Sequence, residues 1–317
     1  MPIRRITILG TGLIGASAGL ALRAHGFDGE LHGWDRDPKQ LAIARERGAI
    51  DHRASDPIAA AAESELVLLS GPVLAIFDWL EQLAPRLSPH QLVTDVGSVK
   101  GAVVERARPL FGGPRQAGFL PGHPMAGKEV SGAANAEAAL FDNAVWFFTP
   151  FAEHPLAAEW RAWVERLGCR TLLMEAEKHD AVCARLSHLP QMVATALSAL
   201  LDDEFGERRQ AGAAERKSSE AEPRAIGGRA LREMTRLGAS PYSMWRDIAH
   251  TNGTEIARAL LALEQRLAFI RENLKGPELR EEFERANHFR SVLNGSAEGA
   301  AEVTHPTTTA KAPDKSQ

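Results

Sequence analysis

Three features are scarce in this sequence: cysteine, excess positive charge and long apolar runs. Cys169 and Cys183 are the only cysteines, too few for a disulfide framework or a thiolate metal site, and this predicts a protein of a reducing compartment, the cytoplasm. The formal net charge of −4 lacks the basic excess of nucleic-acid-binding proteins. No signal-peptide pattern opens the chain and no uncharged apolar run of about 18 residues occurs later, so we expect neither export nor a membrane partner.

The chain is long enough for about two domains, with 317 residues of which 44% are hydrophobic. Up to residue 175, apolar runs alternate between strand and helix spacing. The strands expected after the first two are Leu66–Gly71, Gln91–Gly97, Gly118–His123, Ala144–Thr149 and Arg170–Met174. Strands separated in this way predict an α/β domain over residues 1–175, with a mostly parallel, Rossmann-type sheet.

The clearest motif lies at the start of this domain. A β-branched strand from Arg5 to Leu9 breaks into Gly10, Gly12 and Gly15, and an Ala/Leu-rich helix follows. This G-x-G-x-x-G spacing is typical of a dinucleotide-binding turn. A second strand, Glu30–Asp35, ends in an acid 20 residues after Gly15, the position that reads a ribose hydroxyl. An ordinary glycine turn with a solvated acid is the plain alternative.

The predicted cofactor is NAD, because a carboxylate at Asp35 binds a free ribose 2′-hydroxyl and repels a 2′-phosphate. The neighbouring Arg36 could pair with that phosphate, which leaves NADP open. The residues expected at the cofactor are Gly10, Gly12, Leu13, Ile14, Gly15, Asp35, Arg36, Ser70 and Asp95.

From residue 176 to 289 the pattern is helical only, which predicts a separate helical domain. Residues 202–223 are rich in charge, Ser, Gly and Ala, and we expect a mobile loop there, with a solvated helix as the alternative. Apolar residues then recur at helical spacing over about six turns and predict a helix in a homodimer interface. These residues are Ile256, Leu260, Leu263, Leu267, Ile270 and Leu274. Residues 290–317 lack periodicity and predict a disordered tail.

Polar side chains at strand ends are candidates for chemistry, since ligands bind outside the carboxyl ends of such sheets. Ser98 and Lys100 follow one strand and His123 follows the next. A histidine there suits proton transfer because its ordinary pKa lies near neutral pH. A capping histidine would look the same in the sequence.

The helix expected from Lys178 carries a stripe of small and polar residues on an otherwise apolar surface. The stripe consists of Asp180, Ala184, Ser187, His188, Gln191 and Thr195. Polar side chains on a buried helix need partners, and a ligand cavity would supply them; a solvent-facing stripe is the alternative. Pro190 should free a backbone carbonyl near Leu186 and bend this helix.

Together these segments resemble the prephenate and arogenate dehydrogenases of tyrosine biosynthesis, over residues 4 to about 289. The matching motifs are Gly10–Ser17, Thr94–Lys100, His123–Gly127, His179–Asp180 with Ser187–Pro190, and Thr235–Arg236 with Ser240, Pro241 and Trp245. The glycine motif is common to many dehydrogenases. The other segments, in this order, are specific.

The resemblance implies NAD(P)-dependent oxidative decarboxylation of a cyclohexadienyl carboxylate, without a metal. His123 matches the proton acceptor and Ser98 the serine that hydrogen-bonds this histidine and the substrate hydroxyl. Arg236 matches the arginine that binds a substrate carboxylate, and His188, with Ser187, belongs to the same site. Gln191 stands where many relatives have histidine, so the choice between prephenate and arogenate stays open. A hydroxyacid or imino-acid dehydrogenase and a non-catalytic dinucleotide sensor are the alternatives.

Overall fold

The computed structural model describes residues 2–205 and 226–302. Of these described residues, those up to 259 form one compact unit and those from 260 onward form a second. All the candidate site residues lie in the first unit. None of the helices in the described part of the chain is both long and apolar enough to cross a membrane.

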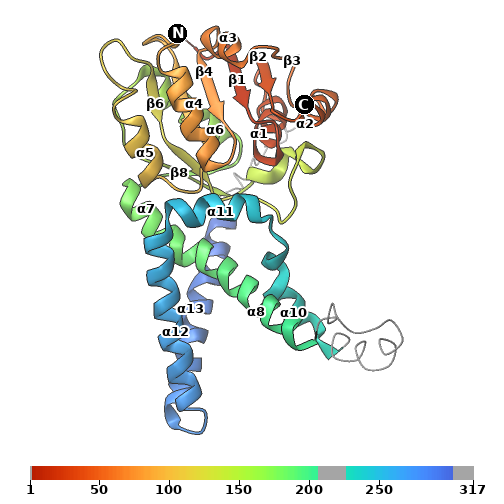
Figure 1. Ribbon diagram of the computed structural model, residues 1–317, viewed down its shortest axis with the longest axis vertical. Coiled ribbons are helices and arrows are strands. Elements are labelled where there is room, and N and C mark those ends of the chain that lie inside the picture. Colours follow the sequence, from red (N-terminus) through yellow and green to blue (C-terminus); the bar gives the residue numbers. More distant parts are fainter. Residues whose placement is uncertain (1, 206–225, 303–317) are drawn as a thin grey trace, which may run out of the picture. The chain divides into compact units, whose positions relative to one another are not determined.

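The first unit is built on a six-stranded parallel sheet in the order β3-β2-β1-β4-β5-β6 (Figure 1). The strands are β1 (Arg5–Leu9), β2 (Glu30–Trp34), β3 (His52–Arg53), β4 (Leu66–Leu69), β5 (Leu92–Asp95) and β6 (Gly118–Leu120). This order confirms the predicted Rossmann-type fold. The strand order reverses between β1 and β4. In folds of this type, ligands bind at the carboxyl ends of the strands at this point. Sequence reasoning missed β3, a strand of two exposed residues.

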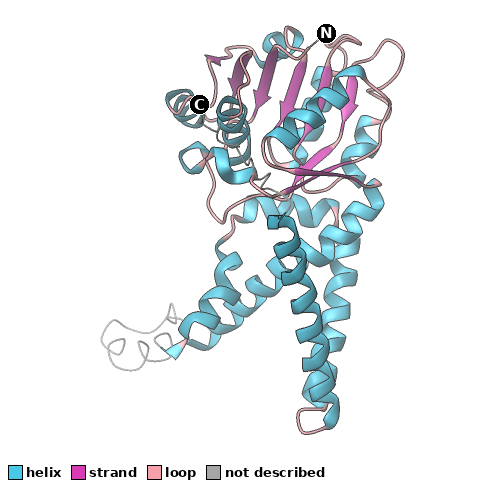
Figure 2. Cartoon of the chain, turned by 180° about the vertical axis from the view of Figure 1, so that it is seen from behind, coloured by secondary structure: helices cyan, strands magenta, loops and turns pink. Residues whose placement is uncertain are grey.

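Helices cover both faces of this sheet (Figure 2). They are α1 (Leu13–Ala24), α2 (Pro38–Glu46), α3 (Pro57–Ala62), α4 (Val73–Leu83) and α5 (Gly101–Ala107). Alternate residues of β1 point to opposite faces: Ile6 and Ile8 join one core cluster and Leu9 joins the other. Both α2 and α3 begin at a proline preceded by an aspartate whose carboxylate accepts a backbone N–H of the first turn.

The last three strands form a second sheet, which corrects the expectation of one continuous sheet. Its strands are β7 (Gly122–Pro124), β8 (Val145–Phe148) and β9 (Arg170–Leu173), with β7 antiparallel to β8. The predicted strand 118–123 is therefore divided at Pro121, which has no N–H to continue a ladder. The backbone N–H of Thr149 donates to the carbonyl of Pro121 at 3.0 Å, so pairing passes to the second sheet at this residue. Two 3₁₀ turns, η1 (Ala133–Asn135) and η2 (Ala138–Phe141), precede β8, and the helix α6 (Pro155–Arg166) follows it.

The helical segment begins with α7 (Ala176–Cys183) and continues through a π-helical stretch, η3 (Ala184–His188), into α8 (Leu189–Phe205). The distortion expected at Pro190 is thus a local widening of the helix immediately before it. A proline ring clashes with the carbonyl four residues earlier in an α-helix, and a π-turn relieves this clash.

The remaining helices are α10 (Gly228–Thr235), the 3₁₀ turn η4 (Arg236–Ala239), α11 (Tyr242–Thr251), α12 (Gly253–Glu272) and α13 (Pro277–Glu302). Two predicted boundaries are wrong. The helix α8 includes 202–205, and the rest of the expected loop, up to residue 223, lies outside the described residues. The helix α13 extends twelve residues past 290, where Ala and Glu favour a helix; residues 303–317 lie outside the described part. In the second unit, Arg266 of α12 donates to Glu282 of α13 at 2.8 Å.

Candidate active site

The loop between β1 and α1 fits a bound phosphate group. Gly10 has a φ of 102°, and a Cβ there would lie 2.4 Å from the Ser70 carbonyl oxygen. A Cβ on Gly15 would lie 2.0 Å from the Gly10 carbonyl oxygen, so the fold itself requires both glycines. A Cβ on Gly12 would meet nothing within 4 Å, and no side chain caps the start of α1 there. The open space at Gly12 therefore lies beside the first-turn N–H groups of α1, which have no partner within their own helix and suit anion binding.

Asp35 follows β2 and is fixed beside this loop. One carboxylate oxygen accepts the backbone N–H of Thr11 at 2.7 Å, and the other accepts that of Asp37 at 2.9 Å. The carboxylate is thus held at the end of β2, next to the glycine loop. Arg36 is exposed beside it.

Of the other residues expected at the cofactor, three lie around the glycine loop. Leu13 and Ile14 are half-buried in the first turn of α1. The hydroxyl of Ser70 is buried without a hydrogen-bond partner among the described residues, and a Cβ on Gly15 would lie 3.0 Å from it. A buried hydroxyl without a partner is uncommon and indicates a place for a ligand group.

Asp95 has a different task from the one expected. Its side chain is fully buried, where one oxygen accepts the N–H of Gly122 at 3.0 Å and the other accepts that of Gly97 at 2.8 Å and pairs with the Lys100 ammonium. Lys100 also donates to the Gly122 carbonyl at 2.7 Å. Both carboxylate oxygens are therefore occupied, and the pair joins the end of β5 to the start of β7.

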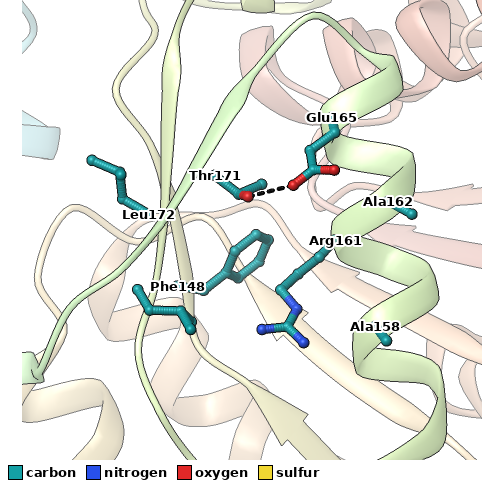
Figure 3. A pocket seen from close by; sticks show the side chains of 8 residues that line it. Phe148, Ala158, Arg161, Ala162, Glu165, Thr171 and Leu172 are labelled. Atoms are coloured by element: carbon teal, nitrogen blue, oxygen red, sulfur yellow. Dashed lines mark hydrogen bonds between the residues drawn. The ribbon is translucent and has the colours of Figure 1, made fainter.

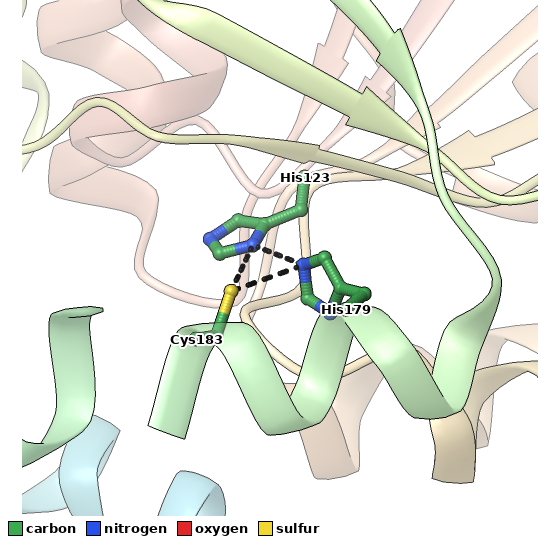
Figure 4. Close-up of side chains that lie close together, drawn as sticks. All are labelled: His123, His179 and Cys183. Carbon is green, nitrogen blue, oxygen red and sulfur yellow. Dashed lines mark hydrogen bonds between the residues drawn. The ribbon is translucent and has the colours of Figure 1, made fainter. Parts of the chain in front are cut away.

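His123, predicted at the end of a strand, lies in the middle of β7, and its ring is buried against α7 (Figure 4). Its Nδ1 lies 2.8 Å from Nε2 of His179. The Cys183 sulfur lies 3.4 Å from the same His179 nitrogen and 4.0 Å from Nδ1 of His123. Figure 4 shows Nε2 of His123 pointing away from both neighbours.

Asp180 connects this histidine pair to the start of α5. Its carboxylate accepts from Nδ1 of His179 at 2.8 Å and from the backbone N–H groups of Lys100 and Gly101 at 2.7 and 2.8 Å. The negative charge thus lies at the N-terminus of α5, where the helix dipole stabilises it.

The cluster of His123, His179 and Cys183 has ligating atoms that all lie within 4.8 Å of one another. Two imidazole nitrogens bound to one zinc ion at 2.0–2.1 Å stand about 3.3 Å apart in tetrahedral geometry. The 2.8 Å between the two histidines matches a direct hydrogen bond instead.

Burial controls protonation in this cluster. Burial chiefly, followed by the charges of His179, Lys100 and His188, lowers the pKa of His123 well below its ordinary 6.5. Burial likewise lowers the pKa of His188 to about 4, against the opposing effect of Asp180, and raises the pKa of Cys183 to about 12. Near neutral pH, His123 is therefore a neutral imidazole able to accept a proton, and Cys183 is a neutral thiol.

His188 lies at the end of η3, buried, with its ring edge-on to Trp245 of α11. Its Nδ1 lies 3.4 Å from the Asn252 amide nitrogen, which also donates to the backbone carbonyl of Asp180. Its Nε2 is buried without a partner in the described part of the chain. Such an orphaned nitrogen fits a residue that contacts a ligand. Ser187 is half-buried beside it.

Gln191 is buried and its amide is already occupied, contrary to the expected contact with substrate. The amide nitrogen donates to the Leu237 carbonyl at 2.7 Å and to Thr195 at 3.2 Å, while the oxygen accepts from Ser240 at 3.1 Å. Leu237 lies within the turn that begins with Arg236, and Ser240 directly follows this turn. Gln191 therefore fixes this turn to α8.

Arg236 itself is exposed over 60% of its side chain and pairs with Glu129. Glu129 follows the His123–Gly127 motif, so the contact brings two of the recognised segments together. No residue pattern pointed to Glu129 in advance, because an isolated surface acid has no periodic signature.

Ser98 lies half-buried in the turn between β5 and α5. Within residues 2–205 no hydrogen bond joins it to His123, contrary to what the family resemblance implied. Nδ1 of His123 is instead in contact with Nε2 of His179.

A surface groove between α6 and β9 is unrelated to these residues (Figure 3). Phe148, Arg161 and Leu172 line it, and Thr171 donates to Glu165 across it at 2.6 Å. It contains no histidine, and none of the predicted site residues reaches it.

Three buried polar residues did not stand out in the sequence as functional on their own: His179, Asn252 and Asp247. His179 and Asn252 contact predicted site residues, whereas Asp247, which is 1% exposed, pairs with the neighbouring Arg246. The available signal was the occurrence of charged or amide side chains inside otherwise apolar helical patterns, which indicates partners elsewhere.

Two domain models of one protein family match most of this chain. Residues 18–170 match the family model of the prephenate dehydrogenase nucleotide-binding domain, and residues 175–290 match that of the prephenate dehydrogenase dimerization domain. A prephenate dehydrogenase of Lactococcus lactis is 31% identical over 251 residues, which cover 79% of this chain and 65% of that protein. The chain thus spans just under two thirds of the length of this relative.

Two solved structures are similar over nearly their whole length. The Synechocystis arogenate dehydrogenase has a TM-score of 0.71 and 30% identity, and the match covers 91% of this chain and 99% of that one. The prephenate dehydrogenase from A. aeolicus, solved with hydroxyphenyl propionate and NAD+, has a TM-score of 0.75 and 28% identity, with 94% and 99% covered. With both domain models matched in order and the fold shared, the chain belongs to the prephenate dehydrogenase family.

Proposed function

We propose that this chain is a dehydrogenase that oxidatively decarboxylates prephenate or arogenate with NAD. The observation that carries the proposal is the buried neutral His123, with Nδ1 bound to His179 and Nε2 without a hydrogen-bond partner among the described residues. Membership of the family supplies the substrate class, a cyclohexadienyl carboxylate. A hydroxyacid or imino-acid dehydrogenase shares the glycine loop but has no need of this histidine arrangement.

The cofactor would lie along the glycine loop, with its pyrophosphate at Gly12 and its ribose at Asp35. When bound, NAD accepts the hydride from the carbinol carbon as the ring loses carbon dioxide and becomes aromatic. The chain supplies the rest: Nε2 of His123 accepts the hydroxyl proton, His188 and Ser187 contact the ring substituents, and Arg236 binds a carboxylate. Ser98 needs a side-chain rotation or the substrate itself to enter this hydrogen-bond set.

The direct test is to incubate the purified protein with NAD and prephenate, and separately with NAD and arogenate, and to follow cofactor reduction. Reduction with either substrate supports the proposal, and the ratio of kcat/KM values defines the preference. NAD binding without turnover of either acid would instead identify a dinucleotide sensor. Repeating the assay with NADP measures how strictly Asp35 selects the cofactor.

His123→Asn tests the role of the proton acceptor. Asparagine keeps a hydrogen-bonding side chain but cannot accept the proton, so kcat should fall by about 10²–10⁴-fold while NAD affinity stays near wild type. In the wild type, kcat/KM should stay constant from neutral pH to below 6.5 and fall only as the pH drops through the lowered pKa. A fall centred at the ordinary histidine pKa, or loss of NAD affinity in step with kcat, would contradict this role.

We also propose that the protein is a homodimer, in the cytoplasm. Leu261 and Leu267 of α12 and Phe283 of α13 are 54%, 57% and 64% exposed in one chain, and such apolar helix faces need a partner. Both cysteines are free, which suits a reducing compartment. Sedimentation equilibrium measures the mass, and a monomer at micromolar concentration would contradict the dimer.

A further inference from the structure

A continuous set of hydrogen bonds runs from the start of α5 to the candidate proton acceptor. The backbone N–H groups of Lys100 and Gly101 donate to Asp180, Asp180 accepts from Nδ1 of His179, and Nε2 of His179 faces Nδ1 of His123. Asp180, His179 and His123 are 6%, 0% and 6% exposed, so water does not compete for these bonds.

The chemistry of the carboxylate decides where each proton lies. Ionised Asp180 has no proton to donate, so Nδ1 of His179 must carry the hydrogen of their shared bond. Neutral His179 then presents a lone pair at Nε2. The bond to His123 can form only if Nδ1 of His123 carries a proton, which leaves the lone pair of His123 on Nε2.

We propose that His179 and Asp180 are positioning residues that fix the proton of His123 on Nδ1 and so reserve its Nε2 lone pair for the substrate hydroxyl. This inference rests on the proposed function, in which His123 accepts that proton. A free imidazole samples both tautomers and rotates, whereas this arrangement fixes both the tautomer and the ring plane.

The same arrangement predicts where acid acts on His123. Because Nδ1 already carries a hydrogen, an added proton can enter the ring only at Nε2, where it occupies the lone pair reserved for the substrate hydroxyl. The other ionisable groups around the pair are Lys100 of α5, Cys183 of α7 and His188 of η3.

Two substitutions of His179 separate positioning from packing. The amide oxygen of His179→Gln can reach the place of Nε2 and accept from His123, whereas His179→Leu offers no acceptor. We expect kcat/KM to fall at least about 10²-fold in the leucine variant, mainly in kcat, and to stay within about tenfold of wild type in the glutamine variant.

His154→Leu is the matched control. His154 also has both ring nitrogens in contacts, with the Leu156 N–H and the Pro89 carbonyl, but it caps α6 outside the site. Its loss should lower the melting temperature slightly and leave kcat/KM and its pH profile unchanged. A similar loss of activity in this control would assign the effect of His179→Leu to stability and overturn the proposal.

Nitrogen NMR of histidine-labelled protein reads the tautomer directly, without substrate. The His123 signals are identified by their absence in His123→Asn. We expect the proton on Nδ1 in the wild type and in His179→Gln, and a mixture or a shift to Nε2 in His179→Leu. A wild-type proton on Nε2 overturns the proposal whatever the activity. An inactive wild type with the proton on Nδ1 overturns the proposed function and leaves the proton placement standing.

Discussion

The buried ion pair of Lys100 and Asp95 should be the most costly polar contact to break in this protein. Both side chains are fully buried, and burial lowers the pKa of Lys100 while the Asp95 carboxylate opposes that shift. Lys100→Met keeps the length of the side chain and removes its charge. The carboxylate of Asp95 and the carbonyl of Gly122 then lose their shared donor in a site that water does not reach.

Removing one partner of a buried pair costs about 3–5 kcal/mol, because the other charge stays desolvated. For a unit of this size each kcal/mol shifts the melting temperature by about 2–4 °C, so Lys100→Met should lower it by about 6–20 °C. Urea unfolding gives the free energy directly. Adding Asp95→Asn removes the stranded charge, and the double variant should regain at least about 1 kcal/mol.

Arg106→Met is the control for a pair of similar geometry at the surface. Arg106 donates to Glu81 at 2.6 Å, but the side chains are 49% and 54% exposed, so its loss should cost less than about 1 kcal/mol. Equal losses of unfolding free energy for Lys100→Met and Arg106→Met would refute the reasoning that burial determines the cost of breaking an ion pair. So would a double variant that is less stable than Lys100→Met alone.

Three further predictions concern the cofactor, the substrate and acid. Asp35→Ser should raise the NADP-to-NAD ratio of kcat/KM, and an unchanged ratio would remove Asp35 from the ribose. Arg236→Gln should raise KM about 10–100-fold, which is the effect expected from losing one hydrogen bond to a charged group. A strongly reduced kcat with an unchanged KM would contradict this. The pKa of His188 is about 4 in the folded chain and 6.5 in the unfolded chain. As the pH falls, the unfolded chain therefore takes up a proton at His188 before the folded chain does. Stability should therefore be complete above pH 6.5 and fall by about 3 kcal/mol towards pH 4 in urea titrations, and His188→Asn should flatten this dependence.

The features predictable from the sequence are those encoded by short stretches of chain. The strand, glycine turn and helix from Arg5 to Ala24 follow from β-branching, glycine spacing and Ala/Leu content, and the acid of Asp35 follows from a fixed spacing. The division at Pro121 also had a local signal, since proline cannot continue a strand ladder. It was missed because the apolar residues on both sides of it read as one strand.

The partners within the site were not predictable in the same way. His123 and His179 are separated by 56 residues, and Lys100 and Asp180 by 80. Periodicity places each of these residues on one face of its own helix or strand. It carries no information on which other element packs against that face. The same limit explains Gln191: its polar atoms were expected to face substrate, and tertiary packing gave them the Arg236 turn instead.

Lys100 shows how the fold uses these distant contacts to position one imidazole, that of His123, the proposed base. Its ammonium holds Asp95 and the Gly122 carbonyl, which sets the backbone immediately before His123. Its backbone N–H holds Asp180, which orients His179 and through it the His123 ring. The side chain of Lys100 thus fixes the main chain before His123, and the backbone N–H of Lys100 fixes the His123 ring through Asp180 and His179. Because α5 follows β5 of the nucleotide-binding sheet directly, the proposed proton acceptor is anchored to the framework that would carry the cofactor.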